Sequence, residues 1–151
     1  MTNQDKLSKG ITGIAGEYFV AAELSRRGFM ASVTLRNNDS IDIHASKNSG
    51  SEIFAIQVKK NQYGGRSWPL NKKCELLKNP NLFYVFVSLK GLTERPEYFI
   101  VPSDHIAESM KNGHEKWLAT PGKKGQPHKD SDMRQFQDKN GEFLEKWDLL
   151  Q

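Results

Sequence analysis

Two strand-like segments joined by a short turn are the feature that most constrains this fold. The segments read SIDIHA (residues 40–45) and EIFAIQVKK (residues 52–60), and the turn sequence KNSGS lies between them. Branched and aromatic apolar residues at alternating positions, bounded by Gly, Ser and Asn, are typical of a β-hairpin. We therefore expect the two segments to pair as antiparallel neighbours.

Alternation along this hairpin places three polar residues on one face. Successive side chains of a strand point to opposite faces of a sheet. The apolar residues that share one face, and so point to a core, are Ile41, Ile43, Phe54, Ile56 and Val58. The opposite face then holds Asp42, Gln57 and Lys59, with the last two about 6–7 Å apart. Antiparallel pairing sets Asp42 across from Ala55 or Gln57.

An acid, an amide and a lysine that converge on one face suit metal-dependent chemistry. Mg²⁺ prefers hard oxygen ligands and keeps several waters, so a carboxylate and an amide oxygen can hold it. Such a metal lowers the pKa of a bound water and neutralises charge on a phosphodiester. A neighbouring lysine can orient that water or stabilise the transition state. The alternative interpretation is a surface hairpin with ordinary polar residues on its solvated face.

An acidic residue in the first predicted helix is a fourth candidate. The segment SKGITGIAGEYFVAAELSRRG (residues 8–28) predicts this helix, because apolar residues recur along one side of it. Glu17 lies at the edge of that stripe, where a carboxylate needs a partner. A metal site in the hairpin would provide one; alternatively Glu17 reaches solvent or pairs with Lys9 or Arg26. Glu23 is expected on the exposed face, beside Arg26.

Three glycines interrupt the same helix, at positions 10, 13 and 16. Each glycine costs a helix interior roughly 1 kcal/mol relative to alanine. They indicate either close packing of the helix backbone on a neighbour or a helix that begins only near Gly13.

The remaining segments predict an α/β fold. Strands are expected at FMASVTL, LFYVFVSL and EYFIVP, and helices at LNKKCELLKN and SDHIAESMKN. The last helix has Ser103 or Asp104 as a candidate N-cap. The order α-β-β-β-α-β-β-α is typical of helices packed around a central mixed sheet. Apolar residues in the C-terminal tail are expected to dock on the body, and Trp117 and Trp147 to lie in the core.

The segments GIAGEYFVAAELSRRGF, IDIHA and FAIQVKK resemble the core of the PD-(D/E)XK nuclease superfamily. They are most similar to the branch that holds Holliday-junction resolvases and methylation-dependent restriction endonucleases. The resemblance covers roughly residues 13–60 and implies a restriction-endonuclease-like core, with a central mixed β-sheet flanked by helices. Ile41 stands where the superfamily name has Pro, and Gln57 stands where many members have Asp or Glu.

This resemblance also implies roles for the four candidate residues. Glu17, Asp42 and Gln57 would be metal ligands, with Gln57 as the variant third position, and Lys59 would be the catalytic lysine. All four would thus form the catalytic site. The cofactor implied is Mg²⁺ or Mn²⁺, and the activity implied is hydrolysis of phosphodiester bonds by a metal-activated water.

A basic segment follows the hairpin directly and reads KKNQYGGRSWPLNKK. From Ile53 to Cys74 the chain contains no Asp or Glu, and local basic patches attract polyanions. Lysines and arginines for phosphates and aromatic rings for stacking are what a nucleic-acid-binding loop needs. The candidates are Lys60, Tyr63, Arg66, Trp68, Lys72 and Lys73. The alternative is an ordinary loop whose Trp68 packs into the core; a second basic run holds Lys123, Lys124 and Lys129.

Composition limits the remaining function classes. The 151 residues are expected to form a single domain over residues 1–151. The chain contains no apolar run long enough to cross a membrane and no secretory signal pattern. Cys74 is the single cysteine, which excludes an intrachain disulfide and a thiolate zinc cluster. A cytoplasmic location is therefore expected.

We expect a metal-dependent endonuclease whose substrate is nucleic acid, with DNA as the expected kind. Cleavage of two strands would require a homodimer. The alternatives are a catalytically inactive nucleic-acid-binding module and a protein-interaction domain on the same fold.

Overall fold

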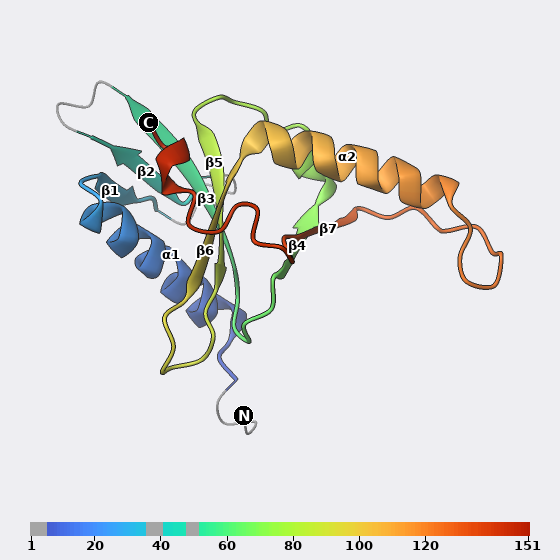
Figure 1. Cartoon of the computed structure of the whole chain (residues 1–151), viewed down its shortest axis with the longest axis horizontal. Coiled ribbons are helices and arrows are strands. Elements are labelled where there is room, and N and C mark those ends of the chain that lie inside the picture. Colours follow the sequence, from blue (N-terminus) through green and yellow to red (C-terminus); the bar gives the residue numbers. More distant parts are fainter. Residues whose placement is uncertain (1–5, 36–40, 48–51) are drawn as a thin grey trace.

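The computed structural model describes residues 6–35, 41–47 and 52–151 of the chain (Figure 1). Residues 48–51 of the predicted hairpin turn, and Ser40 before the first strand, lie outside the described residues. The helices and strands are α1 (Lys9–Arg26), β1 (Met30–Val33), β2 (Ile43–Ser46), β3 (Ile53–Asn61), β4 (Ser67–Asn71), β5 (Leu82–Ser88), β6 (Glu97–Pro102), α2 (Ser103–Ala119) and β7 (Met133–Gln137). Short 3-10 turns add Lys72–Glu75 and Trp147–Leu149.

The described strands form a central five-stranded sheet in the order β1-β2-β3-β5-β6 and a separate two-stranded sheet of β4 and β7. Within the central sheet β3 and β5 run parallel, whereas the other neighbours run antiparallel. The sheet is therefore mixed, as the order of the predicted elements indicated. The predicted hairpin is confirmed, with Ile43 opposite Ile56 and His44 opposite Ala55.

Helix α1 covers one face of this sheet (Figure 1). The Ser8 hydroxyl caps its start by accepting a hydrogen bond from the Ile11 amide. The buried side chains Val20 and Leu24 belong to one core cluster with apolar residues of the sheet, which include Ile43, Phe54, Ile56, Val58, Val85 and Val87. The predicted core residues of the hairpin are thus confirmed, apart from Ile41, which is half-buried.

The glycines of α1 allow it to lie close to β3. A Cβ atom on Gly16 would stand 3.0 Å from the Lys60 Cβ, and one on Gly13 would stand 3.0 Å from the Lys60 Nζ. The helix begins at Lys9, before both glycines. For Gly13 and Gly16, close packing is therefore the interpretation that holds, with Lys60 as the neighbour, whereas a Cβ atom on Gly10 would meet no described atom within 4 Å.

The other face of the sheet is covered by α2 and the β4–β7 pair. The core on this side is aromatic, and it contains Trp68, Tyr84, Phe86, Phe99 and Phe136. The indole N–H of Trp68 donates a 3.0 Å hydrogen bond to the Val87 carbonyl. The tail predicted to dock on the body does so mainly through β7, which pairs with β4, and through the buried Trp147.

Several local expectations were wrong, each for a tertiary reason. The helix predicted over LNKKCELLKN is only a 3-10 turn, because Leu70 and Asn71 already belong to β4. Pro102 is the N-cap residue of α2 without a side-chain cap, since the Ser103 hydroxyl donates to the Asn79 carbonyl instead.

Two side chains predicted from helix patterns also lie elsewhere. Glu23, expected on an exposed face, is 5% exposed and forms ion pairs with Arg26, Arg27 and Arg95. Trp117, expected in the core, is 42% exposed because α2 extends beyond the sheet at that point. No helix among the described residues is long and apolar enough to span a membrane.

Candidate active site

Backbone hydrogen bonds at the start of the hairpin fix Asp42. Its amide donates to the Ile56 carbonyl at 2.9 Å, and its own carbonyl accepts from the Thr34 amide at 2.9 Å. The Asp42 carboxylate accepts a 2.7 Å hydrogen bond from the Val58 amide through Oδ2. Continuing the β2–β3 register by one residue sets Asp42 opposite Gln57. The acid is therefore held beside β3, opposite Gln57 and bonded to the Val58 amide.

Gln57 lies in the middle of β3 and is 8% exposed. It pairs in register with Tyr84 of β5, so its side chain belongs to the face opposite α1. Within the described part of the chain, its amide oxygen Oε1 is buried and accepts no hydrogen bond. An unpaired buried acceptor costs about 1–3 kcal/mol, and such atoms in proteins call for a specific explanation.

Lys59 shares this face and is half-buried. Burial lowers the pKa of its ammonium below the ordinary 10.5; the charge of Asp42 raises this pKa, and that of Lys60 lowers it. Asp42 lies opposite Gln57 in the continued register, and Lys59 follows Gln57 two residues later on the same face of β3. Asp42, Gln57 and Lys59 are thus brought together by the hairpin, as alternation predicted.

A cavity of about 440 Å³ opens beside Gln57 and Lys59. Its wall is completed from other elements by Lys73, Cys74 and Tyr84. Burial raises the pKa of the Cys74 thiol to about 11, aided by Glu75, so this group stays a neutral part of the wall. Burial also raises the pKa of Tyr84. The result is a pocket lined by the half-buried Lys59 and by Gln57, whose amide oxygen is itself buried.

This donor set fits a hard divalent cation. Among the described residues no three His, Cys, Asp or Glu side chains gather as a metal cluster, so a thiolate or histidine site for zinc is not formed there. Asp42 would offer one carboxylate, and the unpaired Oε1 of Gln57 would offer a neutral oxygen. Mg²⁺ and Mn²⁺ accept such oxygen ligands and take water at their other positions.

Glu17 is placed differently from the other three candidates. It lies half-buried on α1, whose core residues pack on the sheet face opposite to Gln57 and Lys59. The cavity beside those two residues is lined from β3, β4, β5 and the segment 73–77. The role of Glu17 as a metal ligand therefore stays a prediction.

The predicted nucleic-acid-binding segment is not a single loop. Its start belongs to β3 and its end to β4 and the following 3-10 turn. The expected role of Trp68 in base stacking is wrong, because its ring is 0% exposed and packs against Phe86, Phe99 and Phe136. The alternative, an indole in the core, is correct.

The other residues of this segment differ in how free they are to meet a ligand. Arg66 is bound to Glu97 at 2.7 Å and lies over the Phe99 ring, which gives it a structural role. Lys60 packs along α1, and Lys72 pairs with Asp132 at 3.1 Å. Tyr63 is 59% exposed, and Lys73 is exposed at the cavity. Tyr63 and Lys73 are therefore accessible candidates, and Lys72 also stays exposed in its surface ion pair.

Residues that support the site were missed by sequence reasoning. Thr34 holds the chain before β2 through its amide and through its hydroxyl, which donates to the Ile41 carbonyl at 2.7 Å. Tyr84 and Cys74 form cavity wall. Alternation within the run LFYVFVSL is a signal for the face of Tyr84, but nothing local pairs it with Gln57.

Comparisons with known proteins bear on the fold. No family model matches the chain, and no curated protein does so either. Among solved structures it is similar to the bacterial homing endonuclease I-Ssp6803I, with a TM-score of 0.55 and 14% identity over 96% of this chain and 92% of that one. A second similar structure is Hjc, a Holliday junction resolvase of Archaeoglobus fulgidus, with a TM-score of 0.46, 15% identity and coverage of 83% and 84%.

The likeness to the homing endonuclease supports the fold that the sequence predicted. The chain has a restriction-endonuclease-like α/β fold, with a mixed central sheet flanked by helices. At 14% identity the likeness concerns the arrangement of the backbone and assigns no role to a side chain.

Proposed function

We propose that this protein is a metal-dependent endonuclease that hydrolyses phosphodiester bonds in DNA. The observation that carries the proposal is the buried, unpaired Oε1 of Gln57, on the same sheet face as Asp42 and Lys59. An oxygen left without a hydrogen bond inside a protein is costly, and a cation would satisfy it. The nuclease fold of the homing endonuclease supports the same activity.

Asp42 and Gln57 are the proposed ligands of Mg²⁺ or Mn²⁺, and Glu17 is the proposed third ligand. When bound, the metal would lower the pKa of a water and offset negative charge on the phosphate. The Val58 amide keeps the Asp42 carboxylate in place by donating to Oδ2. Because this hydrogen bond fixes the Asp42 carboxylate to β3, the position of Asp42 relative to Gln57 stays constant.

Lys59 is the proposed catalytic lysine. Its ammonium is half-buried beside the cavity and interacts with Asp42. A partly desolvated cation stabilises developing negative charge more strongly than one in bulk water. Lys59 would therefore donate a hydrogen bond to the phosphate oxygen that gains charge during hydrolysis.

A duplex or a junction needs two cuts, and one such site serves one strand. We therefore propose a homodimer as the form that cuts both strands. Exposed Tyr63 and Lys73 are the residues of the basic segment proposed to contact DNA near the site.

A second candidate function is a catalytically inactive nucleic-acid-binding module. The observation in its favour is Gln57 itself, since a neutral amide lacks the Coulomb attraction that a carboxylate has for a cation. This candidate predicts salt-sensitive binding that is unaffected by EDTA.

Cleavage of a panel of nucleic acids tests the proposal. The panel holds supercoiled and methylated plasmid, single strands, a four-way junction and structured RNA, each in Mg²⁺, Mn²⁺ and EDTA. We expect metal-dependent cutting that is lost in Lys59→Ala and Asp42→Asn and kept in Lys146→Ala, which removes an exposed lysine elsewhere. Cutting that persists in Asp42→Asn would refute the assigned site. Intact substrates with retained binding would favour the inactive module.

A further inference from the structure

The net positive charge of the protein is concentrated on one projecting part of the fold. We name residues 111–129, the outer half of α2 and the loop that follows it, the distal arm. It contains five lysines and one acidic residue, Glu115. Its formal charge is therefore +4, equal to that of the whole chain, so the rest of the chain is neutral in total. All five lysines are exposed: Lys111, Lys116, Lys123, Lys124 and Lys129.

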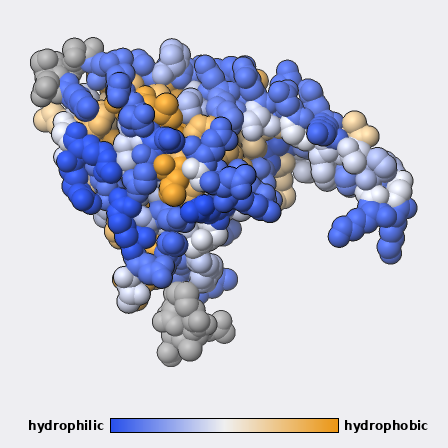
Figure 2. All heavy atoms as spheres, in the orientation of Figure 1, coloured by the Kyte–Doolittle hydropathy of each residue, from blue (hydrophilic) through white to orange (hydrophobic). Residues whose placement is uncertain are grey.

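The distal arm projects from the body of the protein. The last buried residue of α2 is Met110, and the nine helical residues that follow extend the helix by about 14 Å. Figure 1 shows the outer end of α2 and the following loop reaching past the sheets, and Figure 2 shows the loop as a hydrophilic tip. The nearest acidic residues in the sequence are Glu115 within the arm and Asp130 directly after it.

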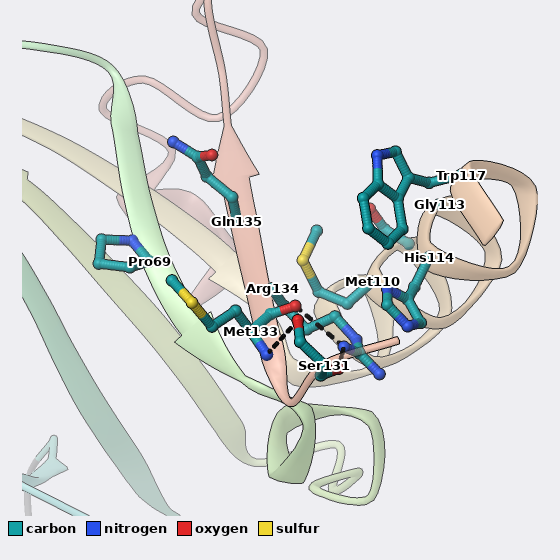
Figure 3. A pocket seen from close by; sticks show the side chains of 10 residues that line it. Pro69, Met110, Gly113, His114, Trp117, Ser131, Met133, Arg134 and Gln135 are labelled. Carbon is teal, nitrogen blue, oxygen red and sulfur yellow. Dashed lines mark hydrogen bonds between the residues drawn. The ribbon is translucent and has the colours of Figure 1, made fainter. Parts of the chain in front are cut away.

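Side-chain stacking holds the loop of the arm onto the helix. The His128 ring stacks on the Trp117 ring at 4.0 Å with an interplanar angle of 4°, and its Nδ1 lies 2.7 Å from the Trp117 carbonyl oxygen. His114 also stacks on Trp117 and pairs with Asp130 at 2.7 Å. Figure 3 shows Trp117 and His114 on α2, beside the strand β7 that carries Met133 and Arg134. These residues line a cavity of about 630 Å³.

A tight turn presents the lysines at the tip. The Gly122 amide donates to the Gln126 carbonyl at 2.8 Å, and the Lys124 amide donates to the Gln126 side chain at 2.9 Å. Gly125 has a φ of 77°, which favours glycine. Lys123 and Lys124 therefore stand on a structured turn, so less conformational freedom is lost when they bind a partner.

The body end of α2 is joined to the wall of the candidate active site. Cys74, which lines the cavity, packs in one cluster with Ile106 and Met110 of α2. The Asn79 amide donates to the Ser103 hydroxyl at 3.1 Å. Helix α2 thus contacts the site wall as far as Met110 and continues for nine residues, about 14 Å, to the outer end of the arm. A duplex rises about 3.4 Å per base pair, so this length corresponds to about four base pairs.

We propose that the distal arm is a second nucleic-acid-binding element, which holds the phosphate backbone of a duplex several base pairs from the candidate active site. Lys123, Lys124 and Lys129 make the contacts. The identity of the partner rests on the proposed function. Phosphate contacts of this kind position the duplex and carry no base specificity.

Binding of a labelled 30-base-pair duplex in EDTA, followed by fluorescence anisotropy across a salt series, tests the arm. The variant Lys123→Gln/Lys124→Gln removes two charges from the tip. The control Lys139→Gln/Lys146→Gln removes two exposed lysines of the body. Each lost phosphate contact makes the slope of log K against log salt less negative by about 0.9. We expect a change of about 1.8 and at least about tenfold weaker binding for the arm variant, and neither change for the control.

Cleavage in Mg²⁺ provides a second readout. The arm variant should cut at the wild-type rate when DNA is saturating and should need about tenfold more DNA to reach half of that rate. Equal thermal unfolding midpoints of wild type and both variants would show that the fold is kept.

The outcomes separate this inference from the proposed function. Unchanged affinity and salt slope in the arm variant, with a wild type that binds and cuts, would overturn the arm alone. Arm-dependent binding without any cutting would support the arm and overturn the nuclease. A wild type that binds no nucleic acid at low salt would overturn both, and an acidic protein would then be the partner to test.

Discussion

Gln57 combines two properties that rarely occur together in a sheet, burial and an unpaired oxygen. In an ordinary core this position would be apolar, because an amide without partners costs free energy. A bound cation turns the same oxygen into a ligand. The neutral amide also sets the charge of the proposed metal site, with Asp42 as the nearby carboxylate.

The substitution Gln57→Glu should strengthen metal binding, because a second carboxylate adds Coulomb attraction to the cation. A ligand that binds the folded state alone raises stability by RT ln(1 + [L]/Kd). We expect MgCl₂ to raise the unfolding temperature of this variant more than that of the wild type, as measured by differential scanning fluorimetry. Gln137→Glu, at an exposed position, is the matched control. An equal Mg²⁺ response in all three proteins would contradict the assignment of Gln57 as a ligand.

Lys59 predicts a pH dependence of stability. Its pKa in the folded protein is lowered, chiefly by burial, from an ordinary 10.5 that the unfolded chain keeps. Between the folded and the unfolded pKa the unfolded state binds more protons, so the contribution of Lys59 to stability rises with pH. At neutral pH the buried charge is a cost, which deprotonation removes.

We therefore expect the difference in unfolding free energy between wild type and Lys59→Met to move in favour of the wild type as pH rises toward 10.5. Urea unfolding at a series of alkaline pH values measures it. A difference that is flat or moves the other way would show that Lys59 is not desolvated.

The contact between α1 and β3 depends on missing side chains. Gly16 faces the Lys60 Cβ, which is fixed to the strand, whereas a Cβ atom on Gly10 would meet no described neighbour within 4 Å. The two glycines lie in the same helix, so alanine gains helix propensity at both. What differs is the space that the new methyl group meets.

Gly16→Ala should destabilise the protein by about 1–2 kcal/mol, because the methyl group forces α1 away from β3. Gly10→Ala should leave stability unchanged or raise it by up to about 1 kcal/mol. Urea unfolding of both variants gives the two values. If Gly16→Ala proved as stable as Gly10→Ala, the helix would not be packed on Lys60 as closely as described.

The two faces of the central sheet differ in the side chains they carry and in what packs on them. One face packs against α1 through mainly aliphatic side chains, and the other carries the candidate site together with the aromatic cluster under α2 and the β4–β7 pair. This division allows polar residues to sit on β3 beside a complete core. It also links the site wall to α2, and through α2 to the distal arm.

Mixed dimers test the proposal that two copies cut a duplex. If each copy cuts one strand, mixing wild type with an excess of Lys59→Ala should convert plasmid mainly to the nicked form, since most active dimers then hold one active site. Wild type alone should give linear product. Gel analysis of the two products over time measures the ratio. If the amount of linear product fell only in proportion to the dilution of the wild type, the two subunits of a dimer would not each cut one strand.

The candidate site and the arrangement of its hairpin could be predicted from local sequence. Asp42, Gln57 and Lys59 share a face because the backbone of any strand alternates its side chains, and a turn between two such strands makes them neighbours. The same rule identified Ile56 and Val58 as core residues. These conclusions need only the geometry of a few consecutive residues.

Whether Trp68 and Trp117 are buried depends on the tertiary structure. Trp68 lies in a basic, glycine-containing segment, yet it is buried because β4 pairs with β7, a strand from a distant part of the chain. Trp117 lies in a helix, yet it is exposed because α2 extends beyond the sheet that would have covered it. Local pattern determines which way a side chain points, whereas burial depends on which distant segment arrives to cover it.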